Sequence, residues 1–265
     1  MTSSTSPARE QIIQKVSAAL EPVEAVRALW MMGSITFDRL DELSDIDLVL
    51  DVRPAGIDPA WDVIEETLES LAPLDYRYEI PQPTWHGHEQ RFFHLAGTPQ
   101  HLLVDAVIMK SGQSPRFDEV ERHGTPSVLF DKDGIVVTTH VDPDEIQAKV
   151  RDRIESIKSL LPLAYSLVGK EIERGRSLDA FAFYQRFVVD NLVALARMKH
   201  DRNRHDFGLR YLGFDIPKNL WDEIEACCYV GDLDELTFRF EVAKELISAL
   251  LQDLEKELAQ SEHRP

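Results

Sequence analysis

The stretch Trp30-Met31-Met32-Gly33-Ser34, followed after a ten-residue spacer by Asp45-Ile46-Asp47-Leu48, decides the fold of this chain. An apolar run over 23–32 that ends at a Gly-Ser pair predicts a buried strand leading into a turn. A second strand is predicted over 46–52, with a helical turn or loop between the two. Together the two stretches predict a strand, a turn and another strand.

Two acidic side chains open the second strand. Asp45 and Asp47 stand at positions i and i+2, so both leave the same face of an extended chain, while Ile46 and Leu48 enter the core. Hard divalent ions such as Mg²⁺ prefer carboxylate oxygens, and they neutralise a triphosphate and lower the pKa of an attacking hydroxyl. Asp45 and Asp47 are therefore candidate ligands of two Mg²⁺ ions.

The Gly-Ser pair suits a phosphate. Glycine lets the backbone approach a phosphate closely, serine offers a hydroxyl, and a following helix would present free N–H groups. We therefore expect Gly33 and Ser34 to bind the triphosphate of a nucleotide, with Arg39 as the nearest cation.

A third carboxylate is expected on a neighbouring strand. Asp105 is an acidic residue inside the otherwise apolar run Leu103-Val104-Asp105-Ala106-Val107, which is costly unless the carboxylate binds something. It completes a predicted catalytic and metal-binding triad with Asp45 and Asp47. The general base for an acceptor hydroxyl stays open between Asp105, Glu79 and Glu89.

The surrounding pattern predicts an α+β protein whose first part holds a mixed β-sheet. Apolar residues with a 3.6-residue period predict a helix over 58–71. Further strands are predicted over 74–80, 91–96 and 101–109, the last being the most hydrophobic and therefore the most central. A hairpin around the Lys132-Asp133-Gly134 turn is expected to end this part.

After residue 141 the apolar pattern becomes helical. Helices are predicted over 142–168, about 177–200, about 217–229 and about 232–259. We therefore expect two domains, a sheet domain over 1–140 and an all-helical domain over 141–265.

The composition disfavours nucleic acid as a partner. Forty-seven acidic residues against 29 basic ones give a formal net charge of -18, which repels phosphate backbones and would attract a cationic small molecule. Cys227 and Cys228 are adjacent, so no disulfide framework is expected and a cytoplasmic location fits best. No apolar run approaches the roughly 20 residues that span a bilayer, so no membrane partner is expected.

The Gly-Ser pair, the spacer and the Asp-apolar-Asp pattern resemble the nucleotidyltransferase superfamily, which includes DNA polymerase β and antibiotic-modifying enzymes. The resemblance covers roughly residues 23–110. The helical part and the segment Arg204-His205-Asp206-Phe207-Gly208-Leu209-Arg210-Tyr211 look more loosely like aminoglycoside and lincosamide nucleotidyltransferases. The resemblance implies a palm-like catalytic domain, a helical domain that closes over the nucleotide, Mg²⁺ as cofactor, ATP as the usual donor and pyrophosphate as product.

These observations predict transfer of a nucleoside monophosphate, AMP from ATP or the equivalent from another NTP, onto a hydroxyl of a small molecule. An aminoglycoside-like, cationic antibiotic is the leading acceptor. Lys199 and Arg204, in the densest basic cluster, are candidate nucleotide-binding residues, although cations at a helix C-terminus have an equally good structural explanation. Two alternatives stay open: AMP transfer to a protein, and a non-catalytic nucleotide-binding or antitoxin-like module. The sequence fixes no oligomeric state.

Overall fold

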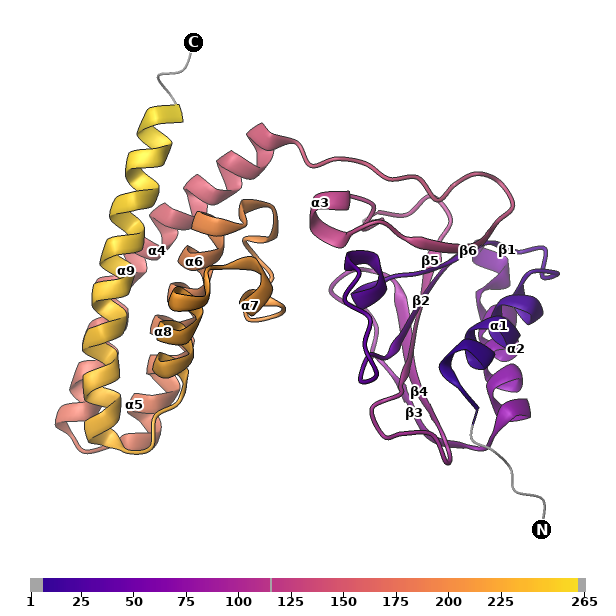
Figure 1. The fold of residues 1–265 in the computed structure, drawn as a ribbon, viewed down its shortest axis with the longest axis horizontal. Helices are drawn as coiled ribbons and strands as arrows, with labels where there is room; N and C mark the ends of the chain where they lie inside the picture. The colour runs from indigo at the N-terminus through magenta and orange to yellow at the C-terminus, as the bar shows by residue number, and fades with distance from the viewer. Residues whose placement is uncertain (1–6, 115, 262–265) are drawn as a thin grey trace. The chain divides into compact units, whose positions relative to one another are not determined.

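The computed structural model describes residues 7–114 and 116–261 (Figure 1). The chain divides into two compact units, with the boundary between His140 and Val141, and each unit has its own hydrophobic core. Among the described residues, every strand lies before this boundary and long helices follow it. The predicted α+β class, a mixed sheet followed by helices, is confirmed.

In the described part of the chain, six strands form one sheet in the order β3-β4-β5-β2-β1-β6. Their bounds are β1 Val26–Met31, β2 Ile46–Val52, β3 Leu74–Glu79, β4 Glu89–Leu95, β5 Val104–Lys110 and β6 Ser127–Asp131. β2 and β5 pair in parallel, whereas the other neighbours pair antiparallel. The central place of β5 agrees with its hydrophobicity.

The two faces of the sheet differ because side chains alternate along each strand. On one face Ile46, Leu48 and Leu50 of β2 join a buried cluster with helices α1 (Arg9–Leu20) and α2 (Ile57–Leu71). Asp47 and Val49 alternate with these residues and lie on the opposite face, where the apolar cluster is smaller. We call the first the helix-covered face and the second the open face.

Two features of the sheet unit differ from the sequence prediction. Helix α1 was not predicted, although its buried residues Ile12, Val16 and Leu20 have helical spacing. The predicted hairpin around the Lys132-Asp133-Gly134 turn is wrong, since residues 135–140 form no strand and, among the described strands, β6 pairs with β1 alone. The Asp131 carboxylate accepts hydrogen bonds from the backbone N–H groups of three following residues, the shortest from Val136 at 2.8 Å, so the chain turns around this side chain.

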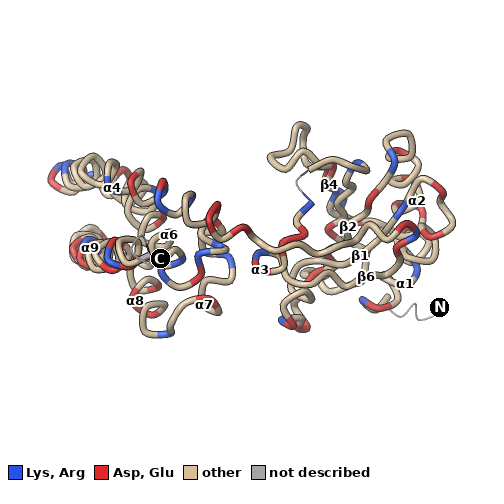
Figure 2. The backbone as a smooth tube through the Cα atoms, turned by 90° about the horizontal axis from the view of Figure 1, so that it is seen from above, with Lys and Arg blue, Asp and Glu red and all other residues tan. Residues whose placement is uncertain are grey.

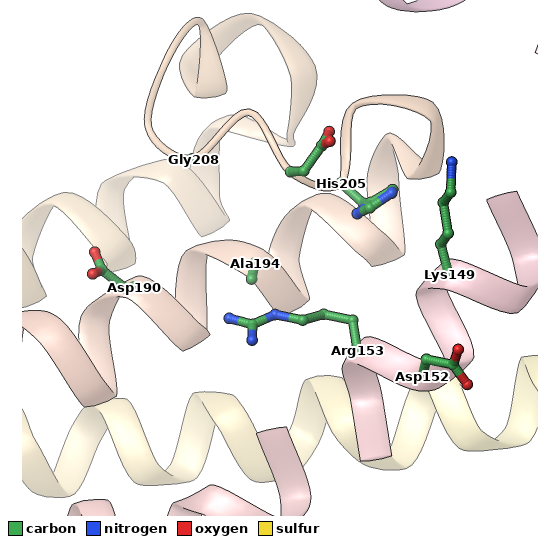
Figure 3. Close-up of a pocket in the computed structure, with 8 residues that line it drawn as sticks. Lys149, Asp152, Arg153, Asp190, Ala194, His205 and Gly208 are labelled. Carbon is green, nitrogen blue, oxygen red and sulfur yellow. The ribbon is translucent and has the colours of Figure 1, made fainter. Parts of the chain in front are cut away.

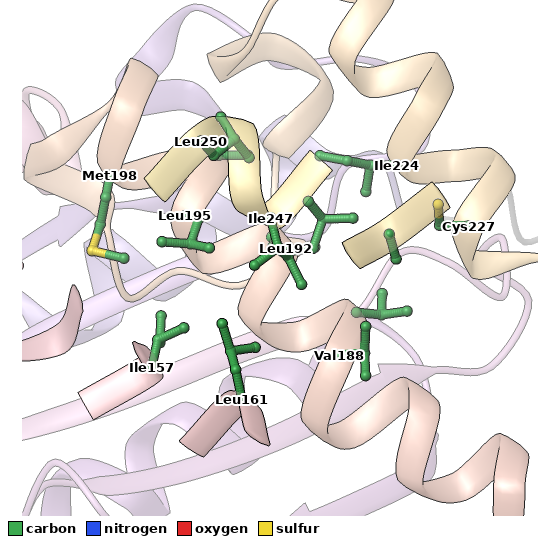
Figure 4. Packing of buried hydrophobic residues seen from close by; sticks show 14 of the residues in the cluster. Ile157, Leu161, Val188, Leu192, Leu195, Met198, Ile224, Cys227, Ile247 and Leu250 are labelled. Atoms are coloured by element: carbon green, nitrogen blue, oxygen red, sulfur yellow. The ribbon is translucent and has the colours of Figure 1, made fainter. Parts of the chain in front are cut away.

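The second unit is a helical bundle with a continuous aliphatic core (Figure 4). Its helices are α4 Pro143–Glu173, α5 Ser177–Tyr184, α6 Asp190–His200, α7 Leu212–Asp215, α8 Lys218–Cys228 and α9 Leu233–Ser261, and a short α3, Val120–His123, precedes the bundle. The Asp142 side chain accepts hydrogen bonds from the backbone of Asp144 and Glu145, and Pro143 occupies the first turn, so α4 begins with a standard cap. None of the described helices is long and apolar enough to cross a bilayer.

The predicted single helix over 177–200 is interrupted by a π-helical turn, Gln185–Val189. The Tyr184 hydroxyl donates to the Cys227 carbonyl oxygen at 2.9 Å, and the Gln185 amide donates to the Cys228 carbonyl oxygen at 3.0 Å. These two bonds join the interrupted turn to the end of α8. The interruption depends on a contact distant in sequence, which local periodicity does not reveal.

Arg197 is a fully buried cation that fastens the segment after α6 to the bundle. Its side chain is 0% exposed, and Nη1 lies 2.9 Å from Oδ2 of Asp215. It also donates to the carbonyl oxygens of Gly208 and Arg210. One side chain therefore holds three points of this segment.

Replacing Arg197 by Met should lower the free energy of unfolding of the helical unit by about 3 kcal/mol, because it leaves a buried carboxylate and two carbonyl groups without this donor. Urea unfolding followed by circular dichroism measures the change. Lys218→Met is the matched control, since Lys218 pairs with Asp222 while its side chain is 85% exposed, and it should leave the transition unchanged. Equal stability of both variants would contradict the anchoring role.

Candidate functional site

Asp47 and Asp105 are neighbours on the two central strands. They are paired in the parallel register of β2 and β5, so their side chains leave the same open face of the sheet. Adjacent parallel strands lie about 4.8 Å apart, which is close enough for two carboxylates to share a cation. The sheet therefore brings together two of the three predicted carboxylates.

Gly33 lies directly against the Asp47 carboxylate. A Cβ atom at this position would lie 1.8 Å from Oδ2 of Asp47, and the residue has a φ angle of +72°. Only glycine meets both demands without strain. The backbone N–H of Met32 donates to the carbonyl oxygen of Asp47 at 3.1 Å, which fixes the turn to β2.

Ser34 begins a short turn rather than a full helix. Residues Gly33–Phe37 form one 3₁₀ segment, which ends at Asp38 in a left-handed conformation, and Ser34 is buried. The turn is anchored by the Thr36 hydroxyl, which lies 2.8 Å from the Gly33 carbonyl oxygen and 2.7 Å from that of His123. The longer helix that could have presented N–H groups to a phosphate is thus replaced by a compact, fixed turn.

Arg39 follows this turn. Its backbone N–H donates to the Ser34 carbonyl oxygen at 3.0 Å, and its guanidinium lies over the Phe37 ring, 5.3 Å from the centroid. Stacking on an aromatic ring leaves a guanidinium able to donate hydrogen bonds at its edge. Arg39 is therefore a cation held beside the Gly-Ser turn, and phosphate binding by it stays a prediction.

Asp45 stands immediately before β2, at the end of a loop that α1 restrains. Arg9 of α1 donates to the carbonyl oxygens of Asp41 and Ser44. Within the loop, the Ser44 hydroxyl bonds to the Asp41 carboxylate at 2.8 Å and lowers the pKa of that carboxyl. The unpredicted helix α1 thus fixes the approach to Asp45.

Asp105 has a partner that sequence reasoning missed. The Gln90 side-chain amide of β4 donates to Oδ1 of Asp105 at 2.7 Å and to Oδ2 at 2.9 Å. The pairing of β4 with β5 places Gln90 on the open face, and no local sequence pattern identifies that register. These two hydrogen bonds from Gln90 fix the orientation of the Asp105 carboxylate.

Glu79 and Glu89, the other two candidates for the general base, bind partners that belong to the helix-covered face. Glu89 accepts a hydrogen bond of 2.9 Å from the indole of Trp61, a core residue of α2. Glu79 pairs with Arg91 at 3.1 Å, and the Arg91 guanidinium lies over the Trp61 ring. Both carboxylates therefore have structural partners away from Asp47, and Asp105 is the remaining candidate for the base.

The carboxylates of Asp47 and Asp105 suit Mg²⁺ as ligands, although they do not form a complete metal site by themselves. Within residues 7–114 and 116–261, no group of three His, Cys, Asp or Glu side chains is already clustered as a metal site. Asp47 and Asp105 nevertheless share one face, and the cradle beside Asp47 exists only because Gly33 has no Cβ. Hard oxygen donors of this kind suit Mg²⁺, which commonly takes one or two protein carboxylates together with substrate phosphates.

Lys199 and Arg204 form ion pairs within the helical unit. Lys199 pairs with Glu257 of α9, and Arg204 lies 2.6 Å from Asp201 and 3.0 Å from Asp215. These partners offset much of the positive charge that a phosphate would require. Contact of either cation with a nucleotide stays a prediction, and the proposal below does not depend on it.

A hollow of about 630 Å³ lies between α4, α6 and the loop after α6 in the helical unit (Figure 3). It is lined by Lys149, Asp152, Arg153, Asp190, Ala194, His205, Asp206 and Gly208. Three aspartates face two cations there, and Lys149 also pairs with Glu145 at 2.6 Å. Acidic and basic residues are interspersed over both units (Figure 2), and the lining of this hollow is likewise mixed in charge.

Comparisons with known proteins give similarities among solved structures alone, since no family model and no curated protein matches the chain. An aminoglycoside 6-adenyltransferase from Bacillus subtilis is 13% identical with a TM-score of 0.36, over 96% of this chain and 92% of that one. A spectinomycin adenyltransferase from Enterococcus faecialis, solved with ATP and spectinomycin, is 12% identical with a TM-score of 0.35, over 95% of this chain and 100% of that one. JHP933 from Helicobacter pylori is 13% identical with a TM-score of 0.27, over 96% and 93%.

The first two of these structures are adenyltransferases, the class of enzyme that the sequence resemblance names. All three superpositions have TM-scores below 0.5.

Replacing Gly33 by Ala should displace the Asp47 carboxylate and destabilise the sheet unit. Gly134→Ala is the matched control, because Gly134 has a similar φ of +65° but nothing within 4 Å of the added Cβ. In both variants the left-handed backbone conformation should lower the free energy of unfolding by about 1 kcal/mol, because alanine adopts it less readily than glycine. Thermal unfolding should show a clearly larger loss for Gly33→Ala, and equal losses would contradict the close approach.

Proposed function

We propose that this protein is a Mg²⁺-dependent nucleotidyltransferase that moves AMP from ATP, or the equivalent group from another NTP, onto a hydroxyl of a small molecule. The observation that carries this proposal is the register pair of Asp47 and Asp105 on the open face, with the Gly33 turn pressed against Asp47. A glycine turn beside two carboxylates that can bind a metal is the combination that transfer from a triphosphate needs.

Each residue of the site has a distinct role in the proposed reaction. The turn at Gly33 and Ser34 binds the triphosphate through backbone and hydroxyl groups. Asp45 and Asp47 would hold two Mg²⁺ ions, and Asp105 would bind the catalytic one. When bound, the metal neutralises the triphosphate and makes the acceptor hydroxyl more acidic. Asp47 and Asp105 belong to the paired strands β2 and β5, and Asp45 stands immediately before β2.

Asp105 is also the general base of the proposal. Its carboxylate accepts the proton of the acceptor hydroxyl, and the hydroxyl oxygen forms a bond to the α-phosphorus in line with the leaving group. The bond between the α-phosphorus and the bridging oxygen breaks, so pyrophosphate leaves with that electron pair. Glu79 and Glu89 take no part because they are bonded to Arg91 and Trp61.

A cationic acceptor suits the charge of the protein. The formal net charge of -18 attracts cations. An aminoglycoside-like antibiotic combines amines with hydroxyl groups and is the leading candidate. Transfer of AMP to a protein is the alternative, and a non-catalytic module is disfavoured because Asp45, Asp47 and Asp105 are all present.

Asp47→Asn should reduce Mg²⁺-dependent pyrophosphate release by at least about 10²-fold, because an amide is a poor ligand for a hard cation. The assay offers ATP with a panel of aminoglycosides and lincosamides. Glu89→Gln is the matched control: it removes an acid from β4 of the same sheet, but from the helix-covered face, and its amide oxygen can still accept from Trp61. It should keep near-normal turnover.

Two results would count against the proposal. Turnover retained in Asp47→Asn would show that this carboxylate is not required. Loss of turnover in both Asp47→Asn and Glu89→Gln, with unchanged folding, would show that the carboxylates required for turnover are not distinguished by their position on the open face.

A further inference from the structure

Gln90 holds the Asp105 carboxylate from the side. On β4, Phe92 lies directly opposite Asp105 and Gln90 lies opposite Val107, so the Gln90 side chain reaches Asp105 diagonally across the strand pair. Its one amide nitrogen donates to both carboxylate oxygens, at 2.7 and 2.9 Å. A donor shared by both oxygens fixes the plane in which the carboxylate lies.

The orientation of the Gln90 amide is set by His86. Nε2 of His86 lies 3.2 Å from Oε1 of Gln90. If the amide were turned over, its oxygen would face the carboxylate and its NH₂ group would face an imidazole N–H. A donor on His86 therefore selects the amide orientation that serves Asp105.

The proton of His86 is placed by the backbone of its own loop. The N–H of His88 donates to Nδ1 of His86 at 3.1 Å. The Thr84 hydroxyl, 3.3 Å from the same nitrogen, donates to the His88 carbonyl oxygen at 2.7 Å. Because Nδ1 is an acceptor, the imidazole proton lies on Nε2 and points to Gln90. The donors run in one direction, from His88 through His86 and Gln90 to Asp105.

The His86 end of this chain of bonds lies in a protected environment. Thr84, His86 and His88 are 8%, 7% and 1% exposed. The His86 ring packs against Trp85 and Phe117, with centroids 5.0 and 6.2 Å away. The bonds among Thr84, His86 and His88 are buried, so water competes little with them and they can keep the His86 ring in one orientation. The bonds of Gln90 to His86 and Asp105 are part-buried.

We propose that Gln90 and His86 are positioning residues that orient Asp105 to receive the proton of the acceptor hydroxyl. This inference rests on the proposed function. A carboxylate offers about four lone-pair sites, and Gln90 uses one on each oxygen. The hydrogen bonds from His86 through Gln90 to Asp105, which we call the relay, therefore set where the other sites point. In this proposal Gln90 acts through Asp105, and His86 acts through Gln90.

Gln90→Leu should lower kcat for pyrophosphate release by about 10- to 100-fold, the usual effect of losing a residue that orients a ligand or base. The KM for the NTP should change less than about twofold, because the Gly33 turn is untouched. Gln113→Leu is the matched control, since the Gln113 amide donates to the Gly87 carbonyl oxygen in the same loop at 3.0 Å. It should leave both constants unchanged.

Two substitutions test the His86 step. His86→Phe keeps a ring in the aromatic cluster but removes the donor to Gln90, so kcat should fall with the KM for the NTP unchanged. His86→Gln places an amide NH₂ group near the former position of Nε2 and should recover most of the lost kcat. A structural role alone would predict the opposite order, because phenylalanine preserves the packing better.

The relay is also measurable without nucleotide or metal. In ¹H–¹⁵N spectra of the whole protein, the side-chain amide signals of Gln90 should shift in His86→Phe and stay in place in Gln113→Leu. The imidazole ¹⁵N signals of His86 should show the proton on Nε2. Unshifted Gln90 signals, or full kcat in Gln90→Leu with an active wild type, would overturn the relay. A wild type that releases no pyrophosphate would instead overturn the proposed function, and the catalytic role of the relay with it.

Discussion

The parallel pairing of β2 with β5 is the constraint on which the site depends. It sets Asp47 beside Asp105 and carries Ile46 and Leu48 into the core on the other side. A slip of one residue would exchange the two faces, burying the carboxylates against α2 and exposing the aliphatic side chains. Each fully buried Leu or Ile contributes about 1.5–3 kcal/mol, so the core holds the register that the carboxylates require.

The same alternation gives different roles to neighbouring residues of one strand. Glu89 and Gln90 are adjacent in β4, yet Glu89 bonds to Trp61 in the helix layer and Gln90 bonds to Asp105 on the open face. Side-chain chemistry alone would have ranked Glu89 as the better candidate for catalysis. Position on the strand determines which residue can take part in the site, because only the open face has both the Gly33 turn and a second carboxylate.

Local patterns predicted the parts of the fold whose signal is local. The strand over 46–52 and the helix over 58–71 were predicted nearly to the residue, because both have a clear hydrophobic period. Asp105 could be identified as an acid within an apolar run. Pairings distant in sequence could not: the relay through Gln90 needs the register of β4, and the interruption after Tyr184 needs the end of α8. The basic cluster around Arg204 was ambiguous in sequence because its partner Asp215 lies beyond the helix.

The most direct test of the central claim is to locate a bound divalent ion. Mn²⁺, added together with a non-hydrolysable ATP analogue, broadens the NMR signals of nuclei near it. The account predicts that the backbone amides of Gly33, Asp47 and Asp105 broaden first, while those of Asp190 and Asp206 in the helical unit are affected later. Broadening centred on Asp190 and Asp206, with the open face of the sheet unaffected, would contradict it.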